Sequence, residues 1–174
     1  TRMSGASNIK KELEAGEEVL GAAAMKFNRH YPAIEVCITA PDVLLMIPMD
    51  IILIEQVLIN LMENAVQHGK TTTKIELRLK SANGLAVFEV ADNGCGIQKE
   101  LLPHLFDGYL TRDQEEISDQ RRNMGIGLSV CMSIVQAHGG TMRARNRKKV
   151  GALLQFTLPL EENSHEHQRQ GSVD

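Results

Sequence analysis

Two asparagines spaced four residues apart, Asn60 and Asn64, fall in an apolar segment with helical periodicity. Residues at this spacing lie on one stripe of a helix, so the two amides share a side of it. An asparagine carbonyl is a neutral oxygen ligand suited to Mg²⁺, which keeps several waters and takes further ligands from phosphate. Asn64 is therefore our candidate metal ligand, although amides that bond to loops or face solvent are the ordinary alternative.

A second block, Asp92-Asn93-Gly94-Cys95-Gly96-Ile97, follows an apolar run that reads as a strand. Asp92 is expected at the exposed end of that strand. An ionised carboxylate only accepts hydrogen bonds, so it could take one from the amino group of adenine, while the glycines let a flat base approach the backbone. A plain Asp-Asn-Gly turn is the alternative, and these residues alone favour it.

The third block, Asn123-Met124-Gly125-Ile126-Gly127-Leu128-Ser129, precedes a segment predicted to be helical. The N-terminus of a helix attracts phosphate through its unpaired N–H groups and its dipole. A glycine pair at a helix start also occurs without any ligand. No GxxxxGK[ST] is present, and no strand leads into GxGxxG, which excludes a Walker phosphate loop and disfavours a dinucleotide fold.

These blocks must be positioned by elements that hydrophobic periodicity and turn residues predict. Asp50 is a good N-cap for a helix that runs through His68, with Gly69 just beyond its end. Residues 104–123 are expected to form a mobile loop, either a lid or a solvated linker. The predicted helices span residues 10–28, 50–68 and 126–137, and the predicted strands span 33–39, 43–47, 74–80, 85–91, 141–146 and 152–158.

Taken together, Asn60 to Ala65, Asp92 to Ile97 and Gly125 to Leu128 resemble, in order and spacing, the N, G1 and G2 boxes of sensor histidine kinases. The similarity extends over about residues 19–160 and includes the run His138-Gly139-Gly140-Thr141. Among sensor kinases, the chain is most similar to the potassium-responsive group. The resemblance implies the Bergerat fold, an α+β two-layer sandwich in which a mixed sheet is backed by about three helices, with an ATP lid.

The same resemblance implies ATP and Mg²⁺ as cofactors. Asn64 would hold Mg²⁺, Asp92 would recognise adenine, and Asn60 and Asn64 would be the catalytic residues. Phe106 and Tyr109 resemble the aromatic box beside the lid. The implied nucleotide-binding residues are Asn60, Asn64, Gln67, His68, Asp92, Gly94, Gly96, Ile97, Tyr109, Arg112, Met124, Gly125, Ile126, Gly127 and Leu128.

Departures from the family pattern keep two further functions open. Gln67 stands where these kinases often carry Lys or Arg, Thr111 where they often carry Arg, and Asn123 where they carry Gly. These changes would suit a regulatory module without transfer activity, which uses nucleotide only to set the conformation of the lid. An ATP hydrolase of the same fold is the other alternative. Asn60 argues against it, because related hydrolases place a Glu base there and Asn cannot accept a proton from water.

The composition limits the partners. A formal net charge of −3 gives no general attraction for nucleic acid. Cys37, Cys95 and Cys131 lack metal or disulfide spacing, which indicates a reducing compartment. No apolar run approaches the roughly 20 residues that cross a bilayer.

No histidine lies in an acidic helical motif, so we do not expect the phosphoacceptor histidine among these residues. We expect a single domain over residues 1–160, monomeric in isolation, with a polar tail over 161–174. It would phosphorylate a histidine on a separate dimerisation domain of its parent protein, serve a response regulator indirectly, and lie on the cytoplasmic side of a membrane-attached parent.

Overall fold

The computed structural model describes residues 9–107 and 118–161, with the backbone alone for residues 118–126. The elements in chain order are β1 (Glu12–Ala15), α2 (Gly16–His30), β2 (Glu35–Thr39), β3 (Met46–Met49), α3 (Ile51–Gly69), β4 (Lys74–Ala82), β5 (Leu85–Asp92), the 3₁₀ helix η1 (Leu102–His104), α4 (Ser118–Ala137), β6 (Met142–Asn146) and β7 (Ala152–Pro159).

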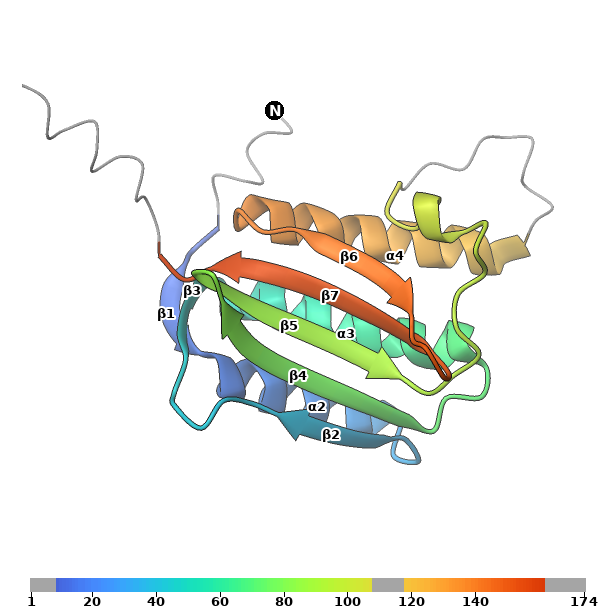
Figure 1. The fold of residues 1–174 in the computed structure, drawn as a ribbon, viewed down its shortest axis with the longest axis horizontal. Helices are drawn as coiled ribbons and strands as arrows, with labels where there is room; N and C mark the ends of the chain where they lie inside the picture. Colours follow the sequence, from blue (N-terminus) through green and yellow to red (C-terminus); the bar gives the residue numbers. More distant parts are fainter. Residues whose placement is uncertain (1–8, 108–117, 162–174) are drawn as a thin grey trace, which may run out of the picture.

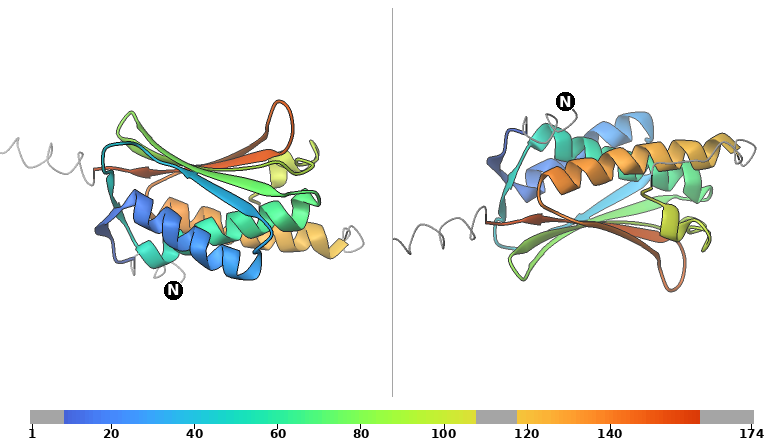
Figure 2. Two further views of the ribbon diagram at one scale, coloured as in Figure 1. Left: turned by 90° about the horizontal axis from the view of Figure 1, so that it is seen from below. Right: turned by 90° about the horizontal axis from the view of Figure 1, so that it is seen from above.

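Five strands form one sheet in the order β2-β4-β5-β7-β6, and β1 pairs with β3 in a separate two-stranded ribbon. Strands β2 and β4 are parallel, whereas the other pairs in the large sheet are antiparallel. Helices α2, α3 and α4 all pack on one face of this sheet (Figures 1 and 2). The predicted α+β two-layer sandwich, with a mixed sheet backed by three helices, is therefore confirmed.

The core lies between the two layers. Leu58, Leu61 and Met62 of α3 are fully buried, as their helical spacing predicts. Phe88 of β5 and Phe156 of β7 are direct cross-strand partners whose rings stack at 4.7 Å between centroids. Burying an aromatic or aliphatic side chain of this size contributes about 1.5–3 kcal/mol, so this apolar layer is the main source of stability.

Helix α3 begins where the sequence predicts. The side chain of Asp50 accepts a hydrogen bond from Leu53 N at 3.5 Å, which caps the helix. Gly69 is the last helical residue rather than the one beyond it, and Lys70 takes the positive φ of 57° at the C-cap. The hairpins of β4 with β5 and of β6 with β7 are also as predicted.

The predicted helix over residues 10–28 starts too early. Residues 12–15 form β1, whose Leu13 lies opposite Pro48 of β3, and α2 begins only at Gly16. Leu13 fits the apolar period of a helix, but pairing with β3 supplies backbone hydrogen bonds that local periodicity does not reveal.

The helix predicted to start after Gly125 starts earlier, because α4 begins at Ser118. The third block therefore lies inside a helix and not at its N-terminus in this structure. Residues 118–124 contain no proline, and a glycine inside a helix costs only about 1 kcal/mol relative to alanine, which does not stop propagation. Of the predicted lid over residues 104–123, residues 108–117 lie outside the described part of the chain.

Within the described ranges, no helix is long and apolar enough to cross a membrane.

Candidate functional site

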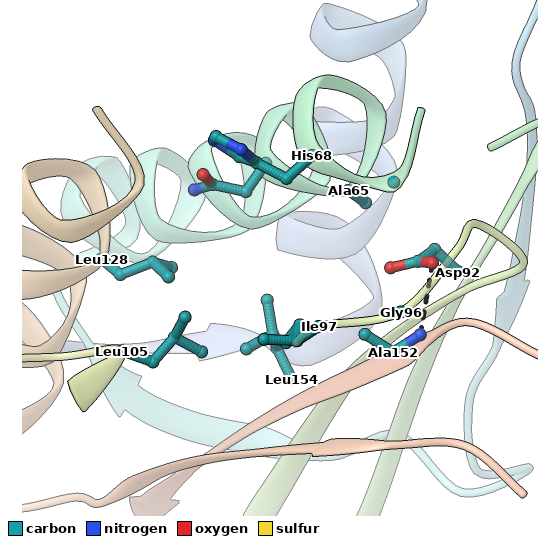
Figure 3. A pocket seen from close by; sticks show the side chains of 11 residues that line it. Ala65, His68, Asp92, Gly96, Ile97, Leu105, Leu128, Ala152 and Leu154 are labelled. Carbon is teal, nitrogen blue, oxygen red and sulfur yellow. Dashed lines mark hydrogen bonds between the residues drawn. The ribbon is translucent and has the colours of Figure 1, made fainter. Parts of the chain in front are cut away.

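A pocket opens between α3, the C-terminal end of β5, the middle of α4 and strand β7 (Figure 3). The space between these elements is about 340 Å³, part of which is open solvent. Its floor and walls are largely apolar, with Asn64, His68 and Asp92 as the polar side chains. The lining residues are Asn64, Ala65, His68, Gly69, Asp92, Gly96, Ile97, Leu105, Leu128, Ala152 and Leu154.

Asp92 is the acidic side chain of the pocket and is only 5% exposed. Its Oδ1 accepts hydrogen bonds from the backbone N–H groups of Gly94, at 2.8 Å, and Ala152, at 3.3 Å. Its Oδ2 has no donor among the described residues and points into the pocket (Figure 3). One carboxylate oxygen thus fixes the side chain, while the other is left for a ligand.

Burial raises the pKa of the Asp92 carboxyl above its ordinary value. The hydrogen bonds from Gly94 and Ala152 and the positive charge of Arg147 act in the opposite direction, because they stabilise the ionised form. A carboxylate that accepts but does not donate is suited to a ligand that presents an N–H group.

The loop after Asp92 is held against the end of α3. Asn93 Oδ1 accepts hydrogen bonds from Thr73 N at 2.9 Å and Lys74 N at 3.1 Å. Cys95 N donates to Gly69 O at 2.9 Å. A Cβ on Gly94 would lie 2.7 Å from the Cα of Gly69, so the close approach of these two backbone segments requires glycine. The asparagine and the glycine together place the loop beside the pocket.

The two asparagines of α3 have different environments. Asn60 Oδ1 accepts from Gln56 Nε2 at 2.9 Å, and its Nδ2 contacts Cys131 Sγ of α4 at 3.8 Å. Burial raises the pKa of the Cys131 thiol to about 11, so the thiol is neutral there. Asn60 is thus already occupied in joining α3 to α4.

Asn64, in contrast, has a free acceptor. Its Nδ2 donates to Asn60 O at 2.9 Å, and no described residue donates to its Oδ1. The described residues contain no group of three or more His, Cys, Asp or Glu side chains that could hold a metal ion. A single amide oxygen fits a cation that takes most of its ligands from phosphate and water, which is the preference of Mg²⁺.

His68 projects from α3 across the pocket from Ile97 and Leu154 (Figure 3). Its Nε2 is buried and has no hydrogen-bond partner among the described residues. Burial lowers the pKa of the imidazole below its ordinary value, so the ring is neutral at pH 7. An unpaired buried nitrogen is costly, and its place in the pocket suits a polar ligand atom.

The structure brings six of the predicted site residues to the pocket: Asn64, His68, Asp92, Gly96, Ile97 and Leu128. Asn60 and Gly94 do not line the pocket but bond to residues that do: Asn60 O accepts from Asn64 Nδ2, and Gly94 N donates to Asp92 Oδ1. Gly127 lies near Asn64, since a Cβ on Gly127 would be 3.8 Å from Asn64 Nδ2. Gln67 is exposed and is not part of the lining.

The other predictions are not placed at side-chain level. Met124, Gly125 and Ile126 lie in α4, where the structure describes the backbone alone, and Tyr109 and Arg112 lie outside the described residues. Phe106, named with Tyr109 as the aromatic box, is partly buried against the core.

Sequence reasoning missed the apolar floor supplied by Leu105, Ala152 and Leu154. It also missed Asn146 and Arg147, which bond to the loop after β5. These two residues adjoin Lys148 and Lys149, so in the sequence they look like part of a solvated turn. Only an Asn at the very end of a predicted strand could have signalled a side chain with a bonding role.

Comparison with known proteins decides the family. The model of the family described as "Histidine kinase-, DNA gyrase B-, and HSP90-like ATPase" matches residues 49–162, which include all three blocks. The chain belongs to this ATPase family. The resemblance seen in the sequence is thereby confirmed, and the domain is a catalytic domain of the sensor histidine kinase type.

Relatives of this ATPase-family domain include sensor protein KdpD of Clostridium acetobutylicum, 38% identical over 157 residues, and sensor protein KdpD of Escherichia coli, 34% identical over 156 residues. Each alignment covers 90% of the chain but only 17% of the relative. The chain thus corresponds to about a sixth of these sensor proteins.

Solved structures agree on the fold. The catalytic domain of histidine kinase ThkA matches with a TM-score of 0.71 and 24% identity, covering 87% of this chain and 97% of that one. The ATP binding domain of PrrB from Mycobacterium tuberculosis also matches with a TM-score of 0.71 and 24% identity, covering 88% and 99%.

Proposed function

We propose that the domain binds Mg²⁺-ATP and transfers the γ-phosphoryl group to a histidine on a separate helical dimerisation domain. The observation that carries the proposal is the divided use of the Asp92 carboxylate. Oδ1 is fixed by two backbone N–H groups, while Oδ2 faces the pocket and has no donor among the residues that the structure describes. The amino group of adenine would supply that donor, and the apolar lining would accept the face of the base.

Asn64 would provide the protein ligand for Mg²⁺ through Oδ1. When bound, the ion would neutralise charge on the phosphate groups, which is its usual contribution to phosphoryl transfer. The hydrogen bond from Asn64 Nδ2 to Asn60 O would hold Oδ1 in place for this role.

The transfer needs no base from this domain. A neutral imidazole nitrogen carries a lone pair, so it can attack the γ-phosphorus directly as the bond from that phosphorus to the bridging oxygen breaks and ADP leaves. Water would first have to give up a proton, and Asn60 cannot take it. Asn60 is instead bonded to Gln56 and Cys131, which favours transfer over hydrolysis.

Calorimetric titration with a non-hydrolysable ATP analogue, with and without Mg²⁺, tests the binding step. We expect Asp92→Asn to weaken binding both with and without the ion, and Asn64→Ala to remove the dependence on Mg²⁺. Unchanged affinity in Asp92→Asn would overturn the adenine assignment.

The transfer step is tested by mixing the domain with the helical dimerisation domain of its parent and radiolabelled ATP. Acid-labile label on the helical domain is the expected product. A domain that binds ATP and leaves the helical domain unlabelled would instead be a regulatory nucleotide sensor. The neutral side chain of Gln67 favours this second candidate, because it supplies no cation where sensor histidine kinases often carry Lys or Arg.

Partners and location follow from the same proposal. A solved complex joins histidine kinase ThkA to response regulator protein TrrA, and it matches this chain with a TM-score of 0.71 and 22% identity, covering 92% of this chain and 48% of that one. We propose that the parent of this domain likewise serves a response regulator, from the cytoplasmic side of a membrane, and that the domain alone is monomeric. Sedimentation of the isolated domain checks the last point.

A further inference from the structure

The turn that follows Asp92 is bonded to a hairpin far along the chain. Asn146, at the end of β6, accepts a hydrogen bond from Ile97 N at 2.7 Å through Oδ1. Its Nδ2 donates to Ile97 O at 2.8 Å. One side-chain amide thus satisfies both backbone groups of Ile97, a residue that lines the pocket, as a neighbouring strand would do.

The same hairpin also contacts Asp92. Arg147 Nη1 donates to Asp92 O at 2.9 Å, and Ala152 N donates to Asp92 Oδ1 at 3.3 Å. A Cβ on Gly151 would lie 1.9 Å from Asp92 O, so the hairpin backbone passes directly against this residue. Both ends of the loop, Asp92 and Ile97, therefore rest on residues 146–152.

The hairpin of β6 and β7 does not need the side chains of Asn146 and Arg147 to close its turn. Arg147 N donates to Gly151 O at 2.9 Å, so the turn is closed by the backbone. The side chains of Asn146 and Arg147 are directed across to the loop instead. Their bonds join segments 49 and 55 residues apart and are made where the pocket is lined.

We propose that Asn146 is a positioning residue of the nucleotide site, which holds Ile97 and the glycine turn at the geometry that binds adenine, with Arg147 supporting Asp92 in the same way. This inference rests on the proposed function. Neither residue lines the pocket, so neither is expected to touch the nucleotide.

The test compares Asn146→Ala with Thr157→Val. Thr157 is a buried residue of β7, and it accepts from Thr141 N at 3.1 Å and pairs with Thr141 Oγ1 at 3.1 Å. Its replacement removes two hydrogen bonds of the same hairpin away from the pocket. Arg147→Met, which removes a single bond to the loop, is the milder second variant.

Two quantities are measured below the unfolding temperature of each variant: the affinity for ADP and for a non-hydrolysable ATP analogue, and the hydrogen-exchange rate of the Ile97 amide without nucleotide. We expect Asn146→Ala to bind both nucleotides about five- to tenfold more weakly and to exchange Ile97 faster, since the net value of one or two hydrogen bonds is lost. Arg147→Met should lose about two- to threefold in affinity. Thr157→Val should bind as the wild type does.

The outcomes separate the two proposals. If the wild type binds nucleotide and Asn146→Ala binds equally well, the positioning role is wrong and the proposed function stands. An equal loss in Thr157→Val would also overturn the positioning role, because the effect would then be general to the hairpin. If folded wild-type protein binds neither nucleotide, the proposed function fails, and the positioning role fails with it.

Discussion

Two aspartate–histidine pairs lie at opposite ends of helix α3, and they differ in how their polar atoms are used. Asp50 precedes the helix and contacts His138 from the end of α4. His68 is in the last turn of the helix, where it shares the pocket with Asp92. Helix α3 has 19 residues, so about 28 Å separates the two ends.

At the Asp50 end, the polar atoms are paired. His138 is 2% exposed, its Nε2 accepts from Asp50 N at 3.0 Å, and its Nδ1 lies 2.8 Å from Ile134 O. The Asp50 carboxylate accepts from Leu53 N and Lys10 N. The histidine therefore acts as a neutral link between two helices, with Nδ1–H as the donor.

At the Asp92 end, one atom of each side chain has no partner among the described residues. These atoms are Oδ2 of Asp92 and Nε2 of His68, and both residues line the pocket. Leaving the buried Nε2 of His68 unpaired costs free energy, which a polar ligand atom would recover on binding. Paired polar atoms thus mark the structural end of the helix, and unpaired ones mark the end that binds.

The largest expected effect is at the paired end. His138→Leu removes the acceptor of Asp50 N and the donor to Ile134 O, so the free energy of unfolding should fall by about 3 kcal/mol. Denaturant titration measures this loss. Nucleotide affinity, measured where the variant is folded, should be unchanged. A loss below about 0.5 kcal/mol, the range of neutral surface changes, would show that the two ends do not differ as described.

Asp92→Asn should separate affinity from stability. An amide oxygen can still accept from Gly94 N and Ala152 N, but an amide nitrogen cannot accept from adenine, so nucleotide binding should weaken by about 1–3 kcal/mol. The folded-state pKa of Asp92 is raised, so ionising it destabilises the folded protein above that pKa. The variant should therefore be at least as stable as the wild type at pH 7, and any advantage should shrink as the pH falls towards 3.8. Lower stability at pH 7 would contradict this assignment.

His68→Phe should raise the free energy of unfolding by about 1 kcal/mol, because it keeps a ring in the pocket and removes the unpaired Nε2. Thermal unfolding without nucleotide measures the gain. His104→Phe is the control: His104 is exposed and pairs with Asp107 at 2.8 Å, so its replacement should have little effect. An equal gain in both variants would show that the buried nitrogen is not the cause.

The smallest effect is in the pH dependence. The folded-state pKa of His68 is lowered, so the unfolded chain takes up a proton first as the pH falls through 6.5. The wild type should therefore lose stability relative to His68→Phe below pH 6.5, down to the folded-state pKa, and the difference should be constant above pH 6.5. Paired unfolding curves from pH 5 to 8 isolate this term. Parallel curves throughout would contradict the lowered pKa.

How much of this the sequence could predict depends on the range of the interactions. The Asp50 cap, the buried face of α3 and the place of Asp92 at a strand end are local patterns, and the structure bears them out. The expected exposure of that strand end was wrong, because the hairpin of β6 and β7 packs against Asp92 and leaves it only 5% exposed. Strand β1 was missed because its pairing partners in β3 are 31 to 37 residues away, and because a run of four residues fits the period of a helix as well as that of a strand. The early start of α4 was missed because glycines weaken a helix without ending it.

The candidate site shows the same division. The family resemblance implied Asn64, His68 and Asp92 as site residues, and the pocket brings them together. Their pairing states could not be predicted, since the hydrogen bonds of His68 and His138 depend on tertiary packing. The contact of Asn146 with Ile97 has no local signature either, because it joins a hairpin end to a loop 49 residues earlier.

The described ends of the chain lie away from the pocket. Strand β1 and the C-terminal end of β7 are at one edge of the domain, while β5 runs to Asp92 at the other (Figure 1). A label or surface attachment introduced beyond β1 or β7 would leave the pocket mouth facing outward. Immobilised samples would then be suited to single-molecule measurement of ligand exchange without a tether crossing the site.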